Sequence, residues 1–151
     1  MEEFKTINDI LDFAIDSEQE AVEFYSTLAS NATNMEMKTV FEQFAKEEMG
    51  HKAMLMKIKS EDTFEIRDQQ IVDLKIADYL VDIEASPDMS YEEALIVAMK
   101  KEKSAFRLYT NLAAKAPNDK MKNIFLSLAQ EESKHKLRFE IEYDDFVLRE
   151  N

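Results

Sequence analysis

The sequence predicts an all-α fold, and three features of the chain predict it. The 151 residues include one glycine and two prolines, so few residues are available for the tight turns that join β-strands. Apolar residues recur at intervals of three and four along four long stretches, a spacing typical of helices that bury one face. The chain also contains an internal repeat, because residues 14–55 align without a gap on residues 98–139.

The repeat relates the two halves of the chain by a shift of 84 positions. Two amphipathic hairpins would share apolar positions by pattern alone. That pattern does not explain why the histidine of one half also aligns with the histidine of the other. We therefore interpret the two halves as copies of one unit. The identities that support this interpretation include Glu18/Glu102, Tyr25/Tyr109, Phe41/Phe125, Glu48/Glu132 and His51/His135.

Each copy is predicted to be a pair of helices joined by a short link, which makes an antiparallel hairpin. The helices are expected near residues 5–31, 34–59, 90–115 and 117–148. Hairpin 1 therefore covers about residues 5–59 and hairpin 2 about residues 90–148. We expect the two hairpins to form a four-helix bundle together. Residues 1–151 are therefore predicted to be a single domain.

Three of the predicted helix starts have local sequence signals. Thr33 with Glu36, and Ser90 with Glu93, have the spacing of a capping box. Pro117 suits a first helical turn, where a missing backbone N–H costs nothing.

Residues 60–89, between the hairpins, are too many for a tight turn and are predicted to form a long crossover. A 25-residue helix is about 38 Å long at 1.5 Å per residue, a distance that this connection can travel. An apolar pattern inside it predicts a short helix that includes Ile71, Leu74, Ala77 and Leu80.

Composition excludes several classes of function. Lys and Arg number 19 against 32 Asp and Glu, for a formal charge of −13, so neither nucleic acid nor a membrane is an expected partner. The chain has no cysteine, which excludes disulfides, zinc-thiolate sites, iron–sulfur clusters and cysteine nucleophiles. No apolar run reaches the ~20 residues of a membrane span, and the start MEEFKTINDI lacks the pattern of a signal peptide. We expect a cytoplasmic protein.

Glutamate interrupts the apolar seam near the middle of each predicted helix, at Glu18, Glu48, Glu102 and Glu132. Two histidines each follow one of these glutamates by three residues, about 4.5 Å along the axis and on the same helical face. These histidines are His51 and His135. In an aligned antiparallel bundle the four mid-helix positions meet at one level.

Four carboxylates buried together without cations would cost several kcal/mol each. Two divalent cations would balance their charge, so the pattern predicts a dinuclear metal site with four glutamate and two histidine ligands. This donor set lacks thiolate and suits iron or manganese, and zinc could also occupy it. We expect two iron ions, because redox chemistry would explain why so costly a core is kept.

Tyr25 and Tyr109 each follow a glutamate by seven residues, about 10.5 Å along the same face. Each could donate a hydrogen bond that orients a glutamate on a neighbouring helix. The alternative is a core tyrosine whose hydroxyl is satisfied elsewhere. Glu47 and Glu131 are also duplicated, but they point about 100° away from the ligand face and are predicted to be surface residues.

Four motifs resemble the rubrerythrin-like branch of the ferritin-like superfamily. They are E18-Q-E-A-V-E-F-Y25, E47-E-M-G-H51, E102-K-S-A-F-R-L-Y109 and E131-E-S-K-H135. The resemblance covers nearly the whole chain and implies a four-helix bundle with a long crossover and a carboxylate-bridged di-iron centre. It implies bridging roles for Glu48 and Glu132, terminal roles for Glu18 and Glu102, and one histidine for each iron.

The resemblance also implies an oxidoreductase that reduces hydrogen peroxide or uses dioxygen. Rubrerythrins proper carry a four-cysteine rubredoxin domain, which a chain without cysteine cannot form. We therefore expect a separate electron donor, such as a rubredoxin-like protein. Ala105 stands where rubrerythrins commonly have an extra glutamate, which puts in doubt the iron movement associated with that ligand. A homodimer or a higher homo-oligomer is expected.

Two other functions remain open. Bacterioferritins use the same ligand set for ferroxidase activity and iron storage, and Met49 resembles their haem-binding methionine. The symmetry of the two halves and the lack of a clear short fifth helix argue against a storage cage, and Met49 has no repeat partner, since its copy is Ser133. The third possibility is a non-catalytic bundle that metal ions hold together and that serves as a binding module.

Overall fold

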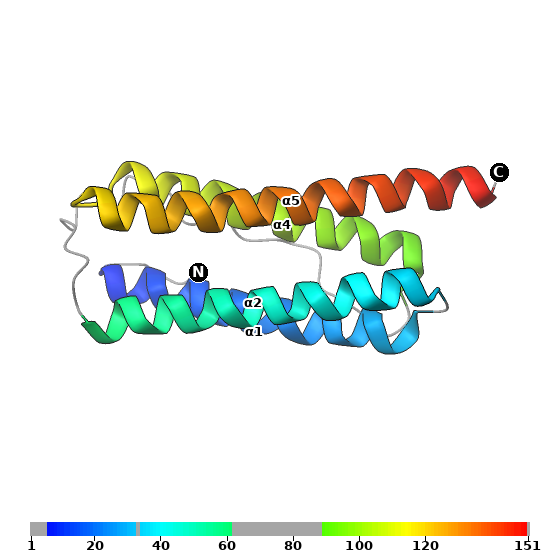
Figure 1. Cartoon of the computed structure of the whole chain (residues 1–151), viewed down its shortest axis with the longest axis horizontal. Helices are drawn as coiled ribbons and strands as arrows, with labels where there is room; N and C mark the ends of the chain where they lie inside the picture. Colours follow the sequence, from blue (N-terminus) through cyan, green and yellow to red (C-terminus); the bar gives the residue numbers. More distant parts are fainter. Residues whose placement is uncertain (1–5, 33, 62–88, 151) are drawn as a thin grey trace. The chain divides into compact units, whose positions relative to one another are not determined.

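The computed structural model describes residues 6–32, 34–61 and 89–150, and every regular element within these ranges is an α-helix. The helices are α1 (Ile7–Asn31), α2 (Met35–Glu61), α4 (Tyr91–Ala114) and α5 (Asp119–Glu150) (Figure 1). The predicted all-α class is confirmed, and each predicted boundary lies within two residues of the observed one. None of these helices combines the length and the apolarity needed to cross a bilayer.

The chain divides into two compact units, Met1–Val72 and Asp73–Asn151, and each is described by itself. In the first unit α1 and α2 run antiparallel and pack against each other, and in the second α4 and α5 do the same (Figure 1). The two predicted hairpins are therefore present. The short helix predicted within the crossover lies outside the described residues.

The first helix of each hairpin starts at a hydroxyl cap. Thr6 accepts a hydrogen bond from the backbone N–H of Asp9 (3.2 Å), and the Asp9 carboxylate accepts one from the N–H of Thr6 (3.1 Å), which completes a capping box. Ser90 is the repeat partner of Thr6 and accepts from the N–H of Glu93 at 3.1 Å. The predicted cap at Ser90 is confirmed, whereas the cap at Thr6 was not predicted.

The second helix of each hairpin starts at an asparagine. Asn34 Oδ1 accepts a hydrogen bond from the N–H of Glu36 at 2.8 Å, and Asn118 Oδ1 accepts one from the N–H of Met121 at 2.9 Å. Thr33, the predicted cap of α2, lies outside the described residues; the cap that the structure shows is Asn34, which satisfies free N–H groups of this first turn. The prediction that Pro117 lies in the first turn of α5 was wrong, because Pro117 precedes the capping residue Asn118.

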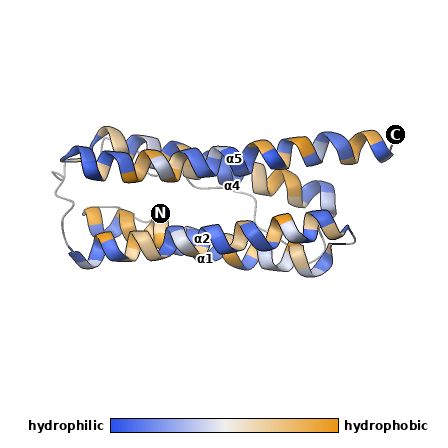
Figure 2. Cartoon of the chain, viewed as in Figure 1, coloured by the Kyte–Doolittle hydropathy of each residue, from blue (hydrophilic) through white to orange (hydrophobic). Residues whose placement is uncertain are grey.

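The cores of the two hairpins repeat one another. Repeat partners that are at most 1% exposed include Leu11/Leu95, Ala14/Ala98, Tyr25/Tyr109 and Phe41/Phe125. Burial of each large apolar side chain contributes about 1.5–3 kcal/mol. Each of the four helices carries both apolar and polar residues along its length, as expected for amphipathic helices (Figure 2).

Substitution Asn118→Ala is expected to lower the free energy of unfolding by about 1 kcal/mol, because it removes the acceptor for the first turn of α5. The midpoint of thermal unfolding should fall by about 3 °C. A matched control is Asn123→Ala, at an exposed position inside α5, where alanine should leave stability unchanged or raise it slightly. Equal effects of the two substitutions would contradict the assigned cap.

Candidate metal centre

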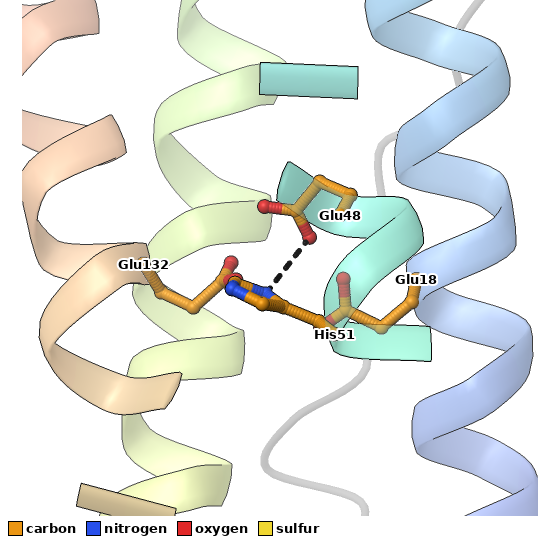
Figure 3. A group of neighbouring side chains, drawn as sticks. All are labelled: Glu18, Glu48, His51 and Glu132. Carbon is orange, nitrogen blue, oxygen red and sulfur yellow. Dashed lines mark ion pairs between the residues drawn. The ribbon is translucent and has the colours of Figure 1, made fainter. Parts of the chain in front are cut away.

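The first hairpin brings three predicted ligands together in its core. Glu18 comes from α1, and Glu48 and His51 come from α2; each is at most 4% exposed. His51 Nδ1 lies 3.7 Å from Glu18 Oε1 and 3.7 Å from Glu48 Oε2. Each residue offers one ligand atom, and these atoms lie within 4.8 Å of one another. Figure 3 shows the three side chains turned toward a common point. We call them the first ligand group.

The second hairpin brings together the repeat partners of these residues. Glu102 comes from α4, and Glu132 and His135 come from α5; each is at most 2% exposed. His135 Nδ1 lies 3.5 Å from Glu102 Oε1, and the group offers ligand atoms within 4.8 Å of one another. We call these residues the second ligand group. Each ligand group thus contains two carboxylates and one imidazole.

Helical geometry explains why each group forms. A glutamate and a histidine three residues apart share one face of their helix, so α2 and α5 each present both side chains to the core of their hairpin. Small residues lie near the glutamates that α1 and α4 contribute, Glu18 and Glu102. Ala14 and Ala21, one turn before and after Glu18, are both buried, and they leave room for side chains from α2. Ala98 is buried in the same way before Glu102.

The buried side chains of the first ligand group change one another's pKa values. Burial raises the pKa of Glu18 well above its usual value, and the neighbouring Glu48 carboxylate raises it further. Burial by itself would lower the pKa of His51, but Glu18 and Glu48 outweigh this effect and raise it from 6.5 to about 11. In the metal-free group the His51 imidazole therefore keeps its proton at neutral pH and offsets part of the negative charge of the two carboxylates. A cation at the same place would compensate the same negative charge.

The chemistry of the donors fits a divalent metal ion of the first transition series. Imidazole nitrogen and carboxylate oxygen suit iron, manganese and zinc, and the absence of cysteine from the chain excludes thiolate ligands. Three protein ligands leave further coordination positions for a bridging carboxylate, a water molecule or a substrate. Both ligand groups could therefore hold a metal ion.

The other residues singled out in the sequence differ in their surroundings. Tyr25 and Tyr109 are buried, and their rings pack on Phe44 (centroids 6.2 Å apart) and Phe125 (6.3 Å) respectively. The hydrogen bonds predicted from their hydroxyls to glutamate ligands stay predictions. Met49 is 54% exposed.

Glu47 and Glu131, which were predicted to be surface residues, are partly exposed. Each directly precedes a glutamate of a ligand group but is not among the ligand atoms of that group. Glu47 accepts a hydrogen bond from Gln43 Nε2 at 3.4 Å on its own helix. These two residues therefore serve as natural controls for substitution of the neighbouring glutamates.

Sequence reasoning missed a third buried carboxylate in the second hairpin, that of Glu142. It accepts hydrogen bonds from the Tyr91 hydroxyl at 3.1 Å and from Arg149 Nη2 at 3.2 Å. Burial and the charge of Glu142 raise the pKa of Tyr91. Glu142 continues the apolar seam of α5 three residues beyond Phe139, which is the signal that could have revealed it. Here an arginine, and not a histidine, accompanies the buried carboxylate.

One comparison with known proteins identifies the family. The family model described as Rubrerythrin matches residues 9–89 and 93–151. No curated protein and no solved structure was found to match the chain. The chain belongs to the rubrerythrin family, and together with the two buried ligand groups this membership indicates a metal centre of the di-iron type.

The metal-free protein is expected to become less stable as pH rises from 6 to 9. A folded-state pKa of about 11 for His51 means that its proton stabilises the fold fully below pH 6.5, and that this contribution is lost as pH rises toward 11. The raised pKa of Glu18 acts in the same direction. After treatment with a chelator, the midpoint of thermal unfolding should fall by about 3 °C or more over this range.

A His51→Gln variant, which lacks the titrating imidazole, should show a shallower dependence on pH. An equally steep dependence in this variant would contradict the role assigned to His51.

Proposed function

We propose that this member of the rubrerythrin family is a non-haem di-iron oxidoreductase that reduces hydrogen peroxide with electrons from a separate donor. In this proposal the hairpins α1–α2 and α4–α5 pack against each other as a four-helix bundle, and the two ligand groups form one dinuclear centre. The observation that carries the proposal is the duplication of a buried Glu–Glu–His group at the middle of two helical hairpins.

Charge balance supports the pairing of the two groups. Together they contain four carboxylates and two imidazoles, and two divalent cations supply the four positive charges that neutralise the carboxylates. Four buried carboxylates without such cations would cost several kcal/mol each. In a dinuclear centre the buried carboxylates, which are the costliest feature of each core, therefore become metal ligands.

Each residue then has a defined role. His51 and His135 would each hold one iron, Glu18 and Glu102 would be terminal ligands, and the carboxylates of Glu48 and Glu132 would bridge the two ions. Two ferrous ions held by these residues would supply the two electrons that, with two protons, convert one hydrogen peroxide to two water molecules. Dioxygen is the alternative oxidant.

The rest of the core would control the environment of this chemistry. Tyr25 and Tyr109 are fully buried, and in this proposal their hydroxyls donate hydrogen bonds that orient glutamate ligands on a neighbouring helix. The buried aromatic and aliphatic side chains around the ligands limit the access of water. The chain has no cysteine with which to build its own electron-transfer centre, so a separate protein is proposed to return the electrons.

Protein purified without added metal and loaded anaerobically with ferrous iron should contain about two iron ions per chain. Glu48→Ala and Glu132→Ala should each reduce this content to one ion or none, because they remove ligands. Glu47→Ala, one position earlier on the same helix as Glu48, is the matched control and should keep two. The proposal of a dinuclear centre fails if all four proteins bind the same amount of iron.

In stopped-flow experiments, peroxide should oxidise the ferrous protein at least about tenfold faster than free ferrous iron, which corresponds to about 1.4 kcal/mol of transition-state stabilisation. Tyr25→Phe should slow this oxidation about tenfold, because the orienting hydrogen bond is lost.

Tyr143→Phe, which removes an exposed hydroxyl bonded to Glu92, should have no effect. Oxidation no faster than that of free iron would refute the peroxidase activity. Continued uptake of added ferrous iron, with many ferric ions retained per chain, would show iron storage instead.

A further inference from the structure

Four large apolar side chains form a row on the outer face of α5. They follow one another at intervals of 11, four and seven residues, which are close to three, one and two turns of an α-helix. This spacing places them along one side of the helix. Each is between 40% and 74% exposed. These residues, which we call the α5 stripe, are Leu126, Leu137, Ile141 and Leu148.

The α5 stripe lies on the opposite side of α5 from the second ligand group. Leu137 follows His135 by two positions, and Ile141 follows Phe139 by two; His135 and Phe139 are both buried in the core of the hairpin. Two positions correspond to a rotation of about 200° around the helix axis. Neither the core between α4 and α5 nor the ligand group therefore uses the stripe.

The hairpin fold does not require apolar residues at these positions. A shift of 84 positions places the first three residues of the stripe on Glu42, Ala53 and Lys57. Single exposed apolar residues are common on protein surfaces, whereas a row of them along one helix face indicates a contact surface. The row is about 33 Å long at 1.5 Å per residue.

Two exposed charges of opposite sign lie beside the stripe, at nearly equal distances from the point between Leu137 and Ile141. Lys134 lies about 60° around the helix from Leu137, and Asp145 lies about 80° from it on the same side. Both side chains are exposed.

An antiparallel pair of identical α5 helices brings these charges together. A two-fold axis at this point places Lys134 level with Asp145 of the partner subunit, and the axis generates the same pair a second time. On the other side of the stripe, Lys136 lies within one residue of the level of Asp144 of the partner subunit. Parallel copies would instead place each charge opposite its own kind.

The apolar residues fit the same arrangement. Leu137 lies beside Ile141 of the partner subunit, close to the two-fold axis. Leu148 of the partner subunit falls in the gap between Leu126 and Leu137, which is the longest interval of the stripe. An interface on a two-fold axis must be complementary to itself, and the stripe meets this requirement in both its charges and its spacing.

We propose that the α5 stripe is the interface of a homodimer, in which α5 of a second copy of this chain packs antiparallel across it. Each chain has a formal charge of −13, so two copies repel each other at long range. The apolar row and the paired charges supply the local attraction that opposes this repulsion. The inference goes beyond the proposed function and does not depend on the dinuclear centre.

Sedimentation equilibrium of the full chain tests the interface, and the wild-type protein should show a concentration-dependent equilibrium between monomer and dimer. Leu137→Gln should raise the dissociation constant at least about tenfold, because it removes an apolar side chain from the centre of the interface. The matched control is Met56→Gln, at an apolar position of α2 that is 51% exposed, and it should leave the constant unchanged. Far-ultraviolet circular dichroism checks that each variant is folded.

Charge reversal tests the antiparallel direction. Lys134→Glu and Asp145→Lys should each weaken the dimer about tenfold, because each places two like-charged pairs across the interface. The variant with both substitutions should dimerise as the wild type does, and an equimolar mixture of the two single variants should form a heterodimer. Lys46→Glu makes the same charge change at an exposed position of α2 and should change the constant less than about twofold.

The distance between two spin labels measures the arrangement directly. Ser127 is exposed, and Ser127→Cys gives the chain a single cysteine to which a label can be attached. In the antiparallel dimer the two labels are separated by about 38 Å along the helix axis. A parallel dimer would bring them close to the interhelical distance of about 10 Å.

Several results would overturn the inference. They are a wild-type chain that stays monomeric, a dimer that Leu137→Gln leaves intact, a short distance between the labels, and a double charge variant that does not recover dimerisation. A monomer whose thermal unfolding midpoint falls in Leu137→Gln would show that another segment of the same chain covers the stripe. The proposed function would survive each of these results, because the iron content per chain tests it separately.

Discussion

The burial of glutamate carboxylates inside helical cores is the constraint on which the rest of this structure depends. Glu18 and Glu48 lie in the core of one hairpin, and Glu102 and Glu132 in the core of the other. A buried carboxylate is costly unless a proton or a cation accompanies it. In the first hairpin this cost is visible in the raised pKa of Glu18. The alanines beside the ligands and the aromatic residues beyond them provide the space and the shielding that such a core needs.

Duplication gives each hairpin a complete set of donors. Glu102, Glu132 and His135 repeat Glu18, Glu48 and His51 in residue type, in burial and in placement on the helices. A centre built from two equal halves needs each half to supply two carboxylates and one imidazole, and each hairpin does so from its own two helices. Family membership and local geometry therefore support the same chemistry.

The surroundings of the two ligand groups are less symmetric than the groups themselves. Lys52 and Gln19 connect the helices of the first hairpin beside its ligands. The second hairpin has a Tyr91–Glu142–Arg149 cluster near one end of its helices. Ligand residues are constrained to remain equal if both ions are to be held, whereas the supporting contacts can diverge between the halves.

The sequence by itself determined the all-α class, the helix boundaries to within two residues, the two hairpins and the pairing of each histidine with a glutamate. These features follow from local spacing, because side chains three or four residues apart share a helical face whatever the rest of the chain does. The cap that Asn34 provides was beyond this reasoning, because asparagine caps helices about as well as the threonine that precedes it in the sequence.

Only the tertiary structure decided which side chains meet across a hairpin. The bonds from Lys52 to Gln19 and from Tyr91 to Glu142 join residues that no periodicity relates. Such contacts depend on the register of one helix against the next, and core packing sets that register. The sequence specified the donors, and the packing of the helices fixed their distances and partners.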